Sequence, residues 1–341
     1  MEIFNNNVYK QTILINKICQ KKGEFYFSTN RTVENHISIK NRETIVWWKT
    51  TSVFFRNLTR IPSKFSNNLR VRINFFLVTI FLLFLVPASL TLAGNKVKRL
   101  LLVGQGPDGH PVGTHEFMPG VNIIADLLQN IQGLELKITK ADEPWQEGPE
   151  LLDAADGLLL FVSQGARWMN QKPDRLDALK RFGRRGGACV ALHWGMGTVE
   201  AQYIAEFVKL FGGCHGGPDR KHQTLKTRIQ FPNIDHPVSR GLNDLNVYDE
   251  FYYQLKFVTP LNTIIPLAQA NIDGKIETIS WAWERSDGGR SFGFSGLHFH
   301  KNWNLTAYRR LMIQAILWTL KLSIPVNGVN VDISEENLKL N

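Results

Sequence analysis

From residue 96 onward, short apolar runs alternate with amphipathic segments. The runs at residues 100–103, 157–162 and 188–192 are continuous, as in strands buried on both faces of a sheet, and they predict strands over residues 97–103, 157–162 and 188–192. Residues 134–139 predict a further strand. Between them, residues 117–131 and 173–182 show helical spacing, and residues 144–152 predict a loop and a short helix. Strands that alternate with helices predict an α/β fold with a doubly wound, mainly parallel sheet.

Residues 198–211 predict a further helix. After residue 211 the pattern changes. A glycine-rich loop is predicted over residues 212–222, and a final amphipathic helix over residues 305–320. Between them lie five strand-like runs, at residues 224–231, 247–257, 263–270, 277–283 and 290–297. We therefore expect one domain over residues 96–328, with additional C-terminal strands that extend or cover the sheet, and a tail over residues 329–341.

The charge is concentrated at the N-terminus. Residues 1–74 carry 13 Lys/Arg and 4 Asp/Glu, whereas residues 75–341 carry 27 and 26. The predicted domain is nearly neutral, which argues against a nucleic-acid partner. Residues 69–93 combine basic residues, an apolar core and a small-residue end, which is typical of a signal peptide; an uncleaved membrane anchor is the alternative. Residues 1–68 form a polar leader, expected to be disordered or not part of the natural protein.

A signal peptide predicts an exported protein, periplasmic or secreted. Contact with a membrane would then come only through an uncleaved N-terminal segment. Two of the three cysteines, Cys189 and Cys214, lie in the predicted domain. They could form a disulfide in an exported protein, but Cys189 has the pattern of a buried strand residue.

His193 ends the fourth predicted strand and is followed by Trp194-Gly195. The carboxyl ends of strands in open α/β sheets are where ligands bind and where chemistry is placed, which favours a functional role for this histidine. A histidine that simply packs in the core is the alternative.

The loop after the first strand contains Gly104-Gln-Gly-Pro-Asp-Gly109, which has the G-x-G-x-x-G spacing of dinucleotide-binding proteins. That role requires a helix to open at the last glycine, but helical spacing begins only near residue 117. We therefore predict a ligand-contacting loop that carries Asp108, His110, His115 and Glu116.

His298 and His300 follow the last predicted strand. If the strand continues through them, they point to one face. Such a pair suits a general base with its orienting partner, or two ligands of a metal. Two surface histidines at a strand end are the alternative.

Residues 247–253 place two carboxylates among aromatic side chains. If the segment is extended, Asp249 and Glu250 lie on opposite faces, and one is expected to face the site and the other solvent. The aromatic candidates for a wall that stacks on sugar rings are Tyr248, Tyr252, Trp281, Trp283 and Trp303. Ordinary core packing is the alternative.

Residues 98–328 resemble the ThuA-like (trehalose utilisation) family. The motifs that carry the resemblance are Val103–Pro111 with Gly113–His115, Ala191–Gly195, Asp235–Gly241, Asp249–Tyr253, Trp281–Glu284 with Gly288–Arg290, and Gly296–His300. The resemblance implies a flavodoxin-like fold similar to that of class I glutamine amidotransferases, which carry a cysteine at a nucleophile elbow and a His-x-Glu pair. Here His193 stands in the cysteine's place and His298 and His300 stand in the pair's, so thioester chemistry is not expected.

The resemblance also implies a protein of carbohydrate catabolism that acts on trehalose, a keto-glycoside or another sugar derivative by hydrolysis, elimination or isomerisation. A non-catalytic carbohydrate-binding protein is the alternative. The candidate catalytic residues are His193, His298 and His300, which act as general acid and base or hold a divalent metal such as zinc. His215 is a further candidate nearby. Candidate substrate-binding residues are Gln105, Asp108, His110, His115, Gln164, Trp194, Asp249, Glu250, Tyr252 and Trp303.

Overall fold

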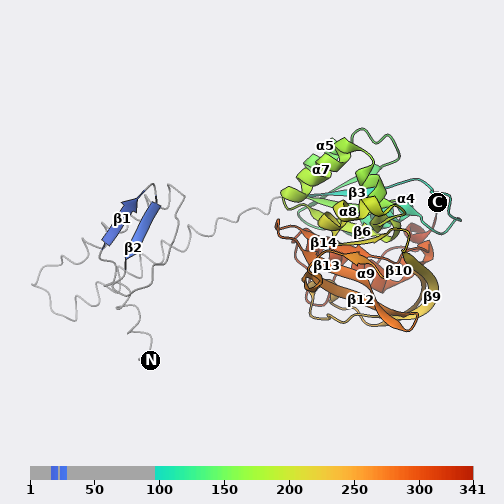
Figure 1. The fold of residues 1–341 in the computed structure, drawn as a ribbon. Coiled ribbons are helices and arrows are strands. Elements are labelled where there is room, and N and C mark those ends of the chain that lie inside the picture. The colour runs from blue at the N-terminus through green and yellow to red at the C-terminus, as the bar shows by residue number, and fades with distance from the viewer. Residues whose placement is uncertain (1–16, 22–23, 29–96, 341) are drawn as a thin grey trace, which may run out of the picture. The chain divides into compact units, whose positions relative to one another are not determined.

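The computed structural model describes residues 17–21, 24–28 and 97–340 (Figure 1). The chain divides into two compact units, Met1–Leu92 and Ala93–Asn341. In the first, β1 (Lys17–Lys21) and β2 (Glu24–Ser28) form an antiparallel pair. The expected signal segment and most of the polar leader lie outside the described residues. Over the described parts of the chain, no helix has both the length and the apolar character needed to cross a bilayer.

The second unit is built on a nine-stranded sheet. In chain order its strands are β3 (Lys98–Gly104), β4 (Leu134–Lys140), β5 (Gly157–Phe161), β6 (Ala188–Leu192), β9 (Lys221–Gln230), β10 (Leu245–Tyr253), β12 (Ile264–Ile272), β13 (Lys275–Glu284) and β14 (Arg290–Phe294). Their order across the sheet is β10-β9-β12-β13-β14-β6-β5-β3-β4. The half from β14 to β4 is parallel, and the half from β10 to β13 is antiparallel.

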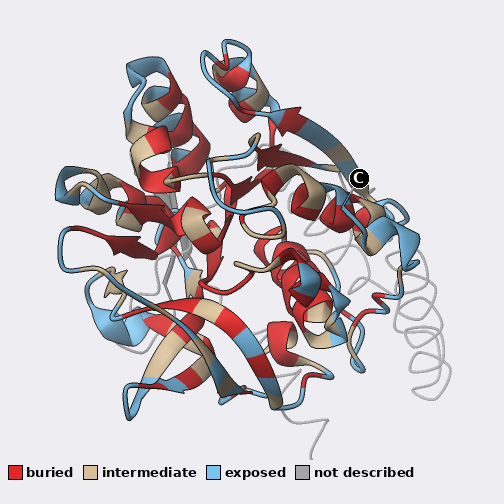
Figure 2. Ribbon diagram, turned by 90° about the vertical axis from the view of Figure 1, so that its right-hand side faces the viewer, coloured by how far each residue is buried: buried red, intermediate tan, exposed pale blue. Residues whose placement is uncertain are grey.

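Helices cover both faces of the parallel half, which explains the continuous apolar runs of β3, β5 and β6. Leu100 and Leu102 of β3 belong to one core, which also contains residues of α4 (Phe117–Leu128) and α9 (Thr306–Thr319). Leu101 and Val103 belong to a second core, which packs under α5 (Gly148–Ala154), α6 (Gly165–Asn170), α7 (Pro173–Arg184) and α8 (Ile204–Phe211). The α/β fold expected from the sequence is confirmed, and the later strands extend the sheet. Figure 2 shows buried residues on the central strands and on the inner faces of the helices.

The segment after β6 differs from the predicted single helix over residues 198–211. It forms a 3-10 turn, η1 (His193–Met196), the short strand β7 (Gly197–Thr198) and a second turn, η2 (Ala201–Tyr203), before α8 begins. The predicted loop at residues 212–222 contains β8 (Gly213–Gly216), which pairs with β7 and with β11 (Lys256–Phe257). Gly212, with φ of +83°, ends α8 and turns the chain into this small sheet.

The C-terminal segment packs on the same unit, since Val329 and Val331 are buried in the first core. Cys189 and Cys214 are both buried free thiols in the described structure, and they form no disulfide with each other. The remaining short turns are η3 (Pro237–Ser239), η4 (Leu261–Thr263), η5 (His300–Asn304) and η6 (Glu336–Leu338).

Candidate functional site

His193 lies at a sharp turn between β6 and η1. Its φ of +46° is in the left-handed region, which a non-glycine residue enters only at an energetic cost. Gly195 makes the turn possible, because a Cβ atom there would lie 2.5 Å from the carbonyl oxygen of Leu160 on the neighbouring strand. The sequence Leu192-His193-Trp194-Gly195 therefore builds an elbow that holds the imidazole at the carboxyl end of the sheet.

The hydrogen bonds of His193 indicate which ring nitrogen carries the proton. Its Nδ1 lies 2.8 Å from the carbonyl oxygen of Ser295, which can only accept, so Nδ1 is the donor. Burial, followed by the nearby imidazoles of His115 and His298, holds the pKa of His193 well below its ordinary value. The ring is therefore neutral at pH 7, and Nε2 carries a lone pair.

His115 approaches from the loop after β3 and is also left-handed, with φ of +52°. Its Nδ1 lies 2.9 Å from Oδ2 of Asp108, and its Nε2 lies 3.1 Å from Nε2 of His193. His110 stacks on His115 and contacts the other oxygen of Asp108 at 2.7 Å. Burial alone would raise the pKa of Asp108, but the hydrogen bonds from both histidines outweigh it and hold the pKa below its usual range. Asp108 thus accepts the Nδ1 proton of His115, and Nε2 of the same ring is turned toward His193.

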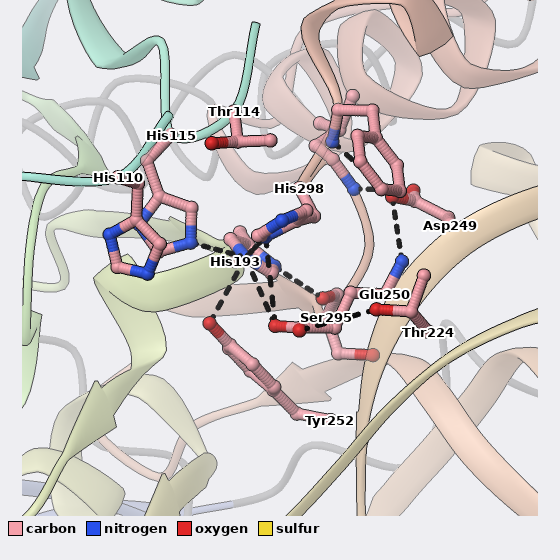
Figure 3. Close-up of polar contacts among 12 residues, drawn as sticks. His110, Thr114, His115, His193, Thr224, Asp249, Glu250, Tyr252, Ser295 and His298 are labelled. Atoms are coloured by element: carbon pink, nitrogen blue, oxygen red, sulfur yellow. Dashed lines mark hydrogen bonds and ion pairs between the residues drawn. The ribbon is translucent and has the colours of Figure 1, made fainter. Parts of the chain in front are cut away.

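His298 and Glu250 complete the group (Figure 3). His298 Nδ1 lies 3.2 Å from His193 Nε2, and burial lowers the pKa of His298 to about 4. Oε1 of Glu250, from β10, lies 3.6 Å from His298 Nδ1 and 3.9 Å from His193 Nε2. The backbone N–H of His115 donates to the carbonyl of His298 at 3.1 Å, which ties the two loops together. We call His115, His193, Glu250 and His298 the histidine–glutamate cluster.

Tyr252 forms the floor beneath the cluster. Its ring is stacked between His193 and His215, with centroid separations of 4.5 and 3.9 Å. Its hydroxyl lies 3.0 Å from His193 Nε2. Burial, with the charges of Glu250 and other carboxylates, raises the pKa of Tyr252 well above its ordinary value, so the hydroxyl remains a proton donor.

The donor atoms of the cluster fit a divalent metal. Two nitrogens bound tetrahedrally to zinc at their usual bond lengths lie about 3.3 Å apart, close to the 3.1 and 3.2 Å between His193 Nε2 and its two histidine neighbours. His115 donates its other ring proton to a carboxylate and His193 to a backbone carbonyl, which is the outer-shell arrangement that orients metal-binding imidazoles. The four ligand atoms all lie within 4.8 Å of one another.

His300 lies away from the cluster. Strand β14 ends at Phe294, and Leu297 has φ of +75°, so His298 and His300 do not share a strand face as the sequence suggested. His300 Nε2 instead donates to the carbonyl of Leu338 at 2.9 Å. His115 takes the place that the sequence assigned to His300.

Several expected ligand contacts are buried in the core. Asp249 is 0% exposed and faces the interior, so Glu250 is the carboxylate at the site. The sequence predicted that one of the two would face solvent, and the structure shows that neither does so fully. Trp281 and Trp303 are 0% and 1% exposed, which excludes them from a stacking wall on the surface. Tyr248 is exposed and packs against Phe299 beside His298.

Three further candidates, Gln105, Gln164 and Trp194, contact other parts of the structure. The side-chain amide of Gln105 bridges two loops. Its Nε2 donates to the carbonyl of Ala141 at 3.1 Å, and its Oε1 accepts from the backbone N–H of Ser163 at 2.9 Å. Gln164 accepts from the backbone N–H of Val199 at 3.2 Å and lines a polar pocket next to Gln105. Trp194 is half-buried against His215 and Tyr252.

Sequence reasoning missed the backbone groups that orient the cluster. The carbonyl of Ser295 fixes the tautomer of His193, yet no side-chain pattern marks a carbonyl. A weak signal was the segment Ser295-Gly296-Leu297, because a glycine between a predicted strand and two histidines suggests a close backbone approach.

Comparisons with known proteins agree with this architecture. The sequence profile of the ThuA family, described as trehalose utilisation, matches residues 108–319. A putative ThuA-like protein from Bacteroides uniformis is 16% identical, with a TM-score of 0.52, over 67% of this chain and 93% of its own. A second, from Parabacteroides merdae, is 14% identical, with a TM-score of 0.51, over 72% of this chain and 100% of its own. The sequence has no significant match among curated proteins.

Proposed function

The chain belongs to the ThuA family, and we propose that it is an enzyme that acts on a sugar derivative, such as a keto-glycoside, through the histidine–glutamate cluster. The observation that carries this proposal is the 3.1 Å contact between Nε2 of His115 and Nε2 of His193. The Nδ1 atom of each ring contacts an acceptor elsewhere, so the two Nε2 atoms are turned toward each other. Neutral imidazoles in this arrangement can direct their lone pairs to one cation.

We therefore propose that His115, His193 and His298 hold a divalent metal such as zinc. Three imidazoles with an open position are a common ligand set of catalytic zinc. When bound, such a metal polarises a carbonyl group or lowers the pKa of a water molecule. The lowered pKa values of His193 and His298 favour binding, because neither ring must lose a proton first at neutral pH.

Glu250 and Tyr252 have roles that follow from their positions beside the imidazoles. The carboxylate of Glu250, within 4 Å of two of the imidazoles, is placed to take a proton from a substrate carbon or from water. The hydroxyl of Tyr252 donates a hydrogen bond and remains protonated. Together they support hydrolysis or elimination by acid–base chemistry, without a covalent nucleophile.

We further propose that the protein is exported, as the basic leader and the apolar run at residues 75–86 suggest. N-terminal sequencing of the native protein, together with its location in fractionated cells, tests this. An intact leader on a protein in the cytosol contradicts it.

The test of the site compares His193→Gln with His300→Gln in the purified protein. We expect the parent to bind about one equivalent of zinc and to convert members of a keto-glycoside panel. His193→Gln should abolish zinc binding and lower turnover on the order of 10³-fold. His300→Gln changes an imidazole that lies outside the cluster, so both properties should stay within about twofold of the parent.

Two results would overturn the proposal. If His193→Gln binds zinc and turns over substrate like the parent, the cluster is not the site. If the parent binds the panel sugars but converts none of them, and binding survives His193→Gln, the protein is a carbohydrate-binding protein instead.

A further inference from the structure

The segment at residues 295–299 contributes two parts of the cluster. The carbonyl of Ser295 holds the Nδ1 proton of His193, and His298 supplies a third imidazole. The segment follows β14 and, apart from an isolated bridge between Phe299 and Thr114, has no regular hydrogen-bonding pattern. Leu297 adopts φ of +75°, which costs energy in a residue with a branched side chain. Contacts from outside the segment must therefore hold it.

Asp249 provides side-chain contacts that add to the backbone hydrogen bonds from Ser295 to Ile279 and from His115 to His298. Its carboxylate is fully buried and accepts from two backbone N–H groups of the segment, with Oδ2 2.8 Å from Leu297 N and Oδ1 3.4 Å from Phe299 N. It also accepts from the backbone N–H of Glu250 at 2.9 Å and from the hydroxyl of Tyr308 at 3.1 Å. Figure 3 shows Asp249 apart from the imidazoles and joined to backbone nitrogens.

Gly296 allows the carboxylate to come this close. A Cβ atom on Gly296 would lie 3.0 Å from Oδ2 of Asp249 and 2.7 Å from the ring of Phe294. The segment is thus wrapped around the carboxylate with no room for a side chain at its centre. A neutral amide of the same shape could not replace Asp249, because it offers one acceptor oxygen where the structure uses two.

We propose that Asp249 is a positioning residue, which fixes the tautomer of His193 and the aim of His298 by holding residues 295–299. It has no surface exposed to a ligand. The inference rests on the proposed function in one respect: it takes the histidine–glutamate cluster to be the functional site that Asp249 positions. The alternative is that Asp249 merely anchors β10 to α9 through Tyr308, which would make it important for stability alone.

The experiment compares Asp249→Asn with Tyr308→Phe. The first change turns an NH₂ group toward one pair of donors and disrupts the segment. The second removes the contact with α9 but leaves both backbone donors paired. We expect Asp249→Asn to weaken zinc binding about 10- to 100-fold, as loss of outer-shell partners does, and Tyr308→Phe to leave it within about twofold, even where the two variants lose similar thermal stability.

A second measurement needs neither metal nor substrate. In the metal-free parent, the Nδ1 proton of His193 is buried and hydrogen-bonded, so its NMR signal should exchange slowly with water. The signal should be lost or exchange faster in Asp249→Asn and persist in Tyr308→Phe. It reports on the proposal even if the parent neither binds zinc nor converts a sugar, and so separates failure of this inference from failure of the proposed function.

If Asp249→Asn does not fold, Gly296→Ala replaces it, because the added methyl group pushes the segment off the carboxylate. Gly296→Ala should reproduce the loss of the His193 signal. A folded Asp249→Asn or Gly296→Ala protein with the parent's signal and zinc affinity overturns the proposal. The proposal is also overturned if Asp249→Asn and Tyr308→Phe lose zinc affinity and the His193 signal to the same extent, because this would indicate a purely structural role.

Discussion

Two neighbouring strands, β6 and β14, carry a buried polar cluster at each end. They run parallel, with Cys189 beside Ser291 near their amino ends and Leu192 beside Phe294 at their carboxyl ends. The guanidinium of Arg285 occupies the amino ends, and the histidine–glutamate cluster occupies the carboxyl ends. The same pair of strands therefore allows a direct comparison of two ways to bury polar groups.

At the amino ends, every nitrogen of the guanidinium has a partner. Arg285 Nε is 3.1 Å from both carboxylate oxygens of Asp287, Nη1 is 3.0 Å from Ser291 Oγ, and Nη2 is 2.8 Å from the carbonyl of Gly187. Donors meet acceptors throughout. Such a cluster is complete without a ligand.

At the carboxyl ends, imidazole nitrogens contact one another instead of separate donors and acceptors. His115 Nε2 contacts only His193 Nε2 among the polar contacts of the described residues, and the latter already accepts from the hydroxyl of Tyr252. A buried group that lacks a complementary partner costs free energy unless something supplies one. The difference teaches that hydrogen-bond matching, rather than burial or charge, separates the structural cluster from the candidate site.

The largest effect on folding is expected for the Arg285 cluster at the amino ends of β6 and β14. Arg285→Met keeps an apolar stem but leaves the carbonyl of Gly187 and the hydroxyl of Ser291 without their donor. The free energy of unfolding should fall by about 3 kcal/mol, the lower part of the range for breaking a buried charged network, because Asp287 is partly exposed to water. Chemical denaturation measures this change.

In the folded Arg285→Met protein, zinc affinity should remain within about twofold of the parent, since the two clusters lie at opposite ends of the strands and share no partner. A loss of zinc affinity comparable with that of His193→Gln would remove the distinction between the two ends.

The second prediction concerns acid. Burial lowers the pKa of His215 to about 3 and that of His298 to about 4, below the value of about 6.5 in an unfolded chain. Between these values the unfolded chain binds more protons than the folded protein, so stability falls as the pH falls from about 6.5. Each such histidine contributes at most about 1.4 kcal/mol per pH unit.

His215→Phe keeps the ring stacked on Tyr252 and removes one of these groups. The slope of unfolding free energy against pH, measured on metal-free protein between pH 6 and 4, should therefore decrease by up to about 1.4 kcal/mol per unit. The control is Arg285→Met, which should keep the parent's slope because a guanidinium does not titrate in this range. An unchanged slope in His215→Phe would show that the buried imidazoles do not dominate acid sensitivity.

The sequence predicted the parallel half and the position of His193 because both follow from local patterns. Apolar runs bounded by glycines mark β5 and β6, and the carboxyl ends of parallel strands meet at one edge. The identity of the third histidine did not follow from a local pattern. His298 and His300 were paired on the assumption of an extended strand, but the left-handed Leu297 breaks it, and His115 arrives from a loop 78 residues before His193.

The carboxylates teach the same point. Strand alternation correctly separates Asp249 from Glu250, but it cannot say which one faces the site. That choice depends on how the antiparallel half curves and packs against α9, where Tyr308 reaches Asp249. Such long-range packing cannot be predicted from the sequence of a single strand.

The smallest effect is expected for Cys189→Ala, which concerns the one thiol near the elbow. Cys189 lies four residues before His193, is 0% exposed, and accepts from Arg285 Nη1 at 3.3 Å, so it belongs to the structural end of β6. Burial raises the pKa of its thiol to about 11, and the thiolate needed for nucleophilic attack is therefore scarce at neutral pH.

Cys189→Ala should lower the free energy of unfolding by about 1 kcal/mol, through a small cavity and one weak hydrogen bond. Zinc affinity and turnover should match the parent within about twofold, because no atom of Cys189 reaches the cluster. The measurement is a denaturation curve paired with the sugar assay and, as a control, a glutaminase assay of the parent. Glutaminase activity that disappears in Cys189→Ala would mean that a thiol in the structural cluster performs chemistry, and complete hydrogen bonding would then no longer distinguish structure from function in these two strands.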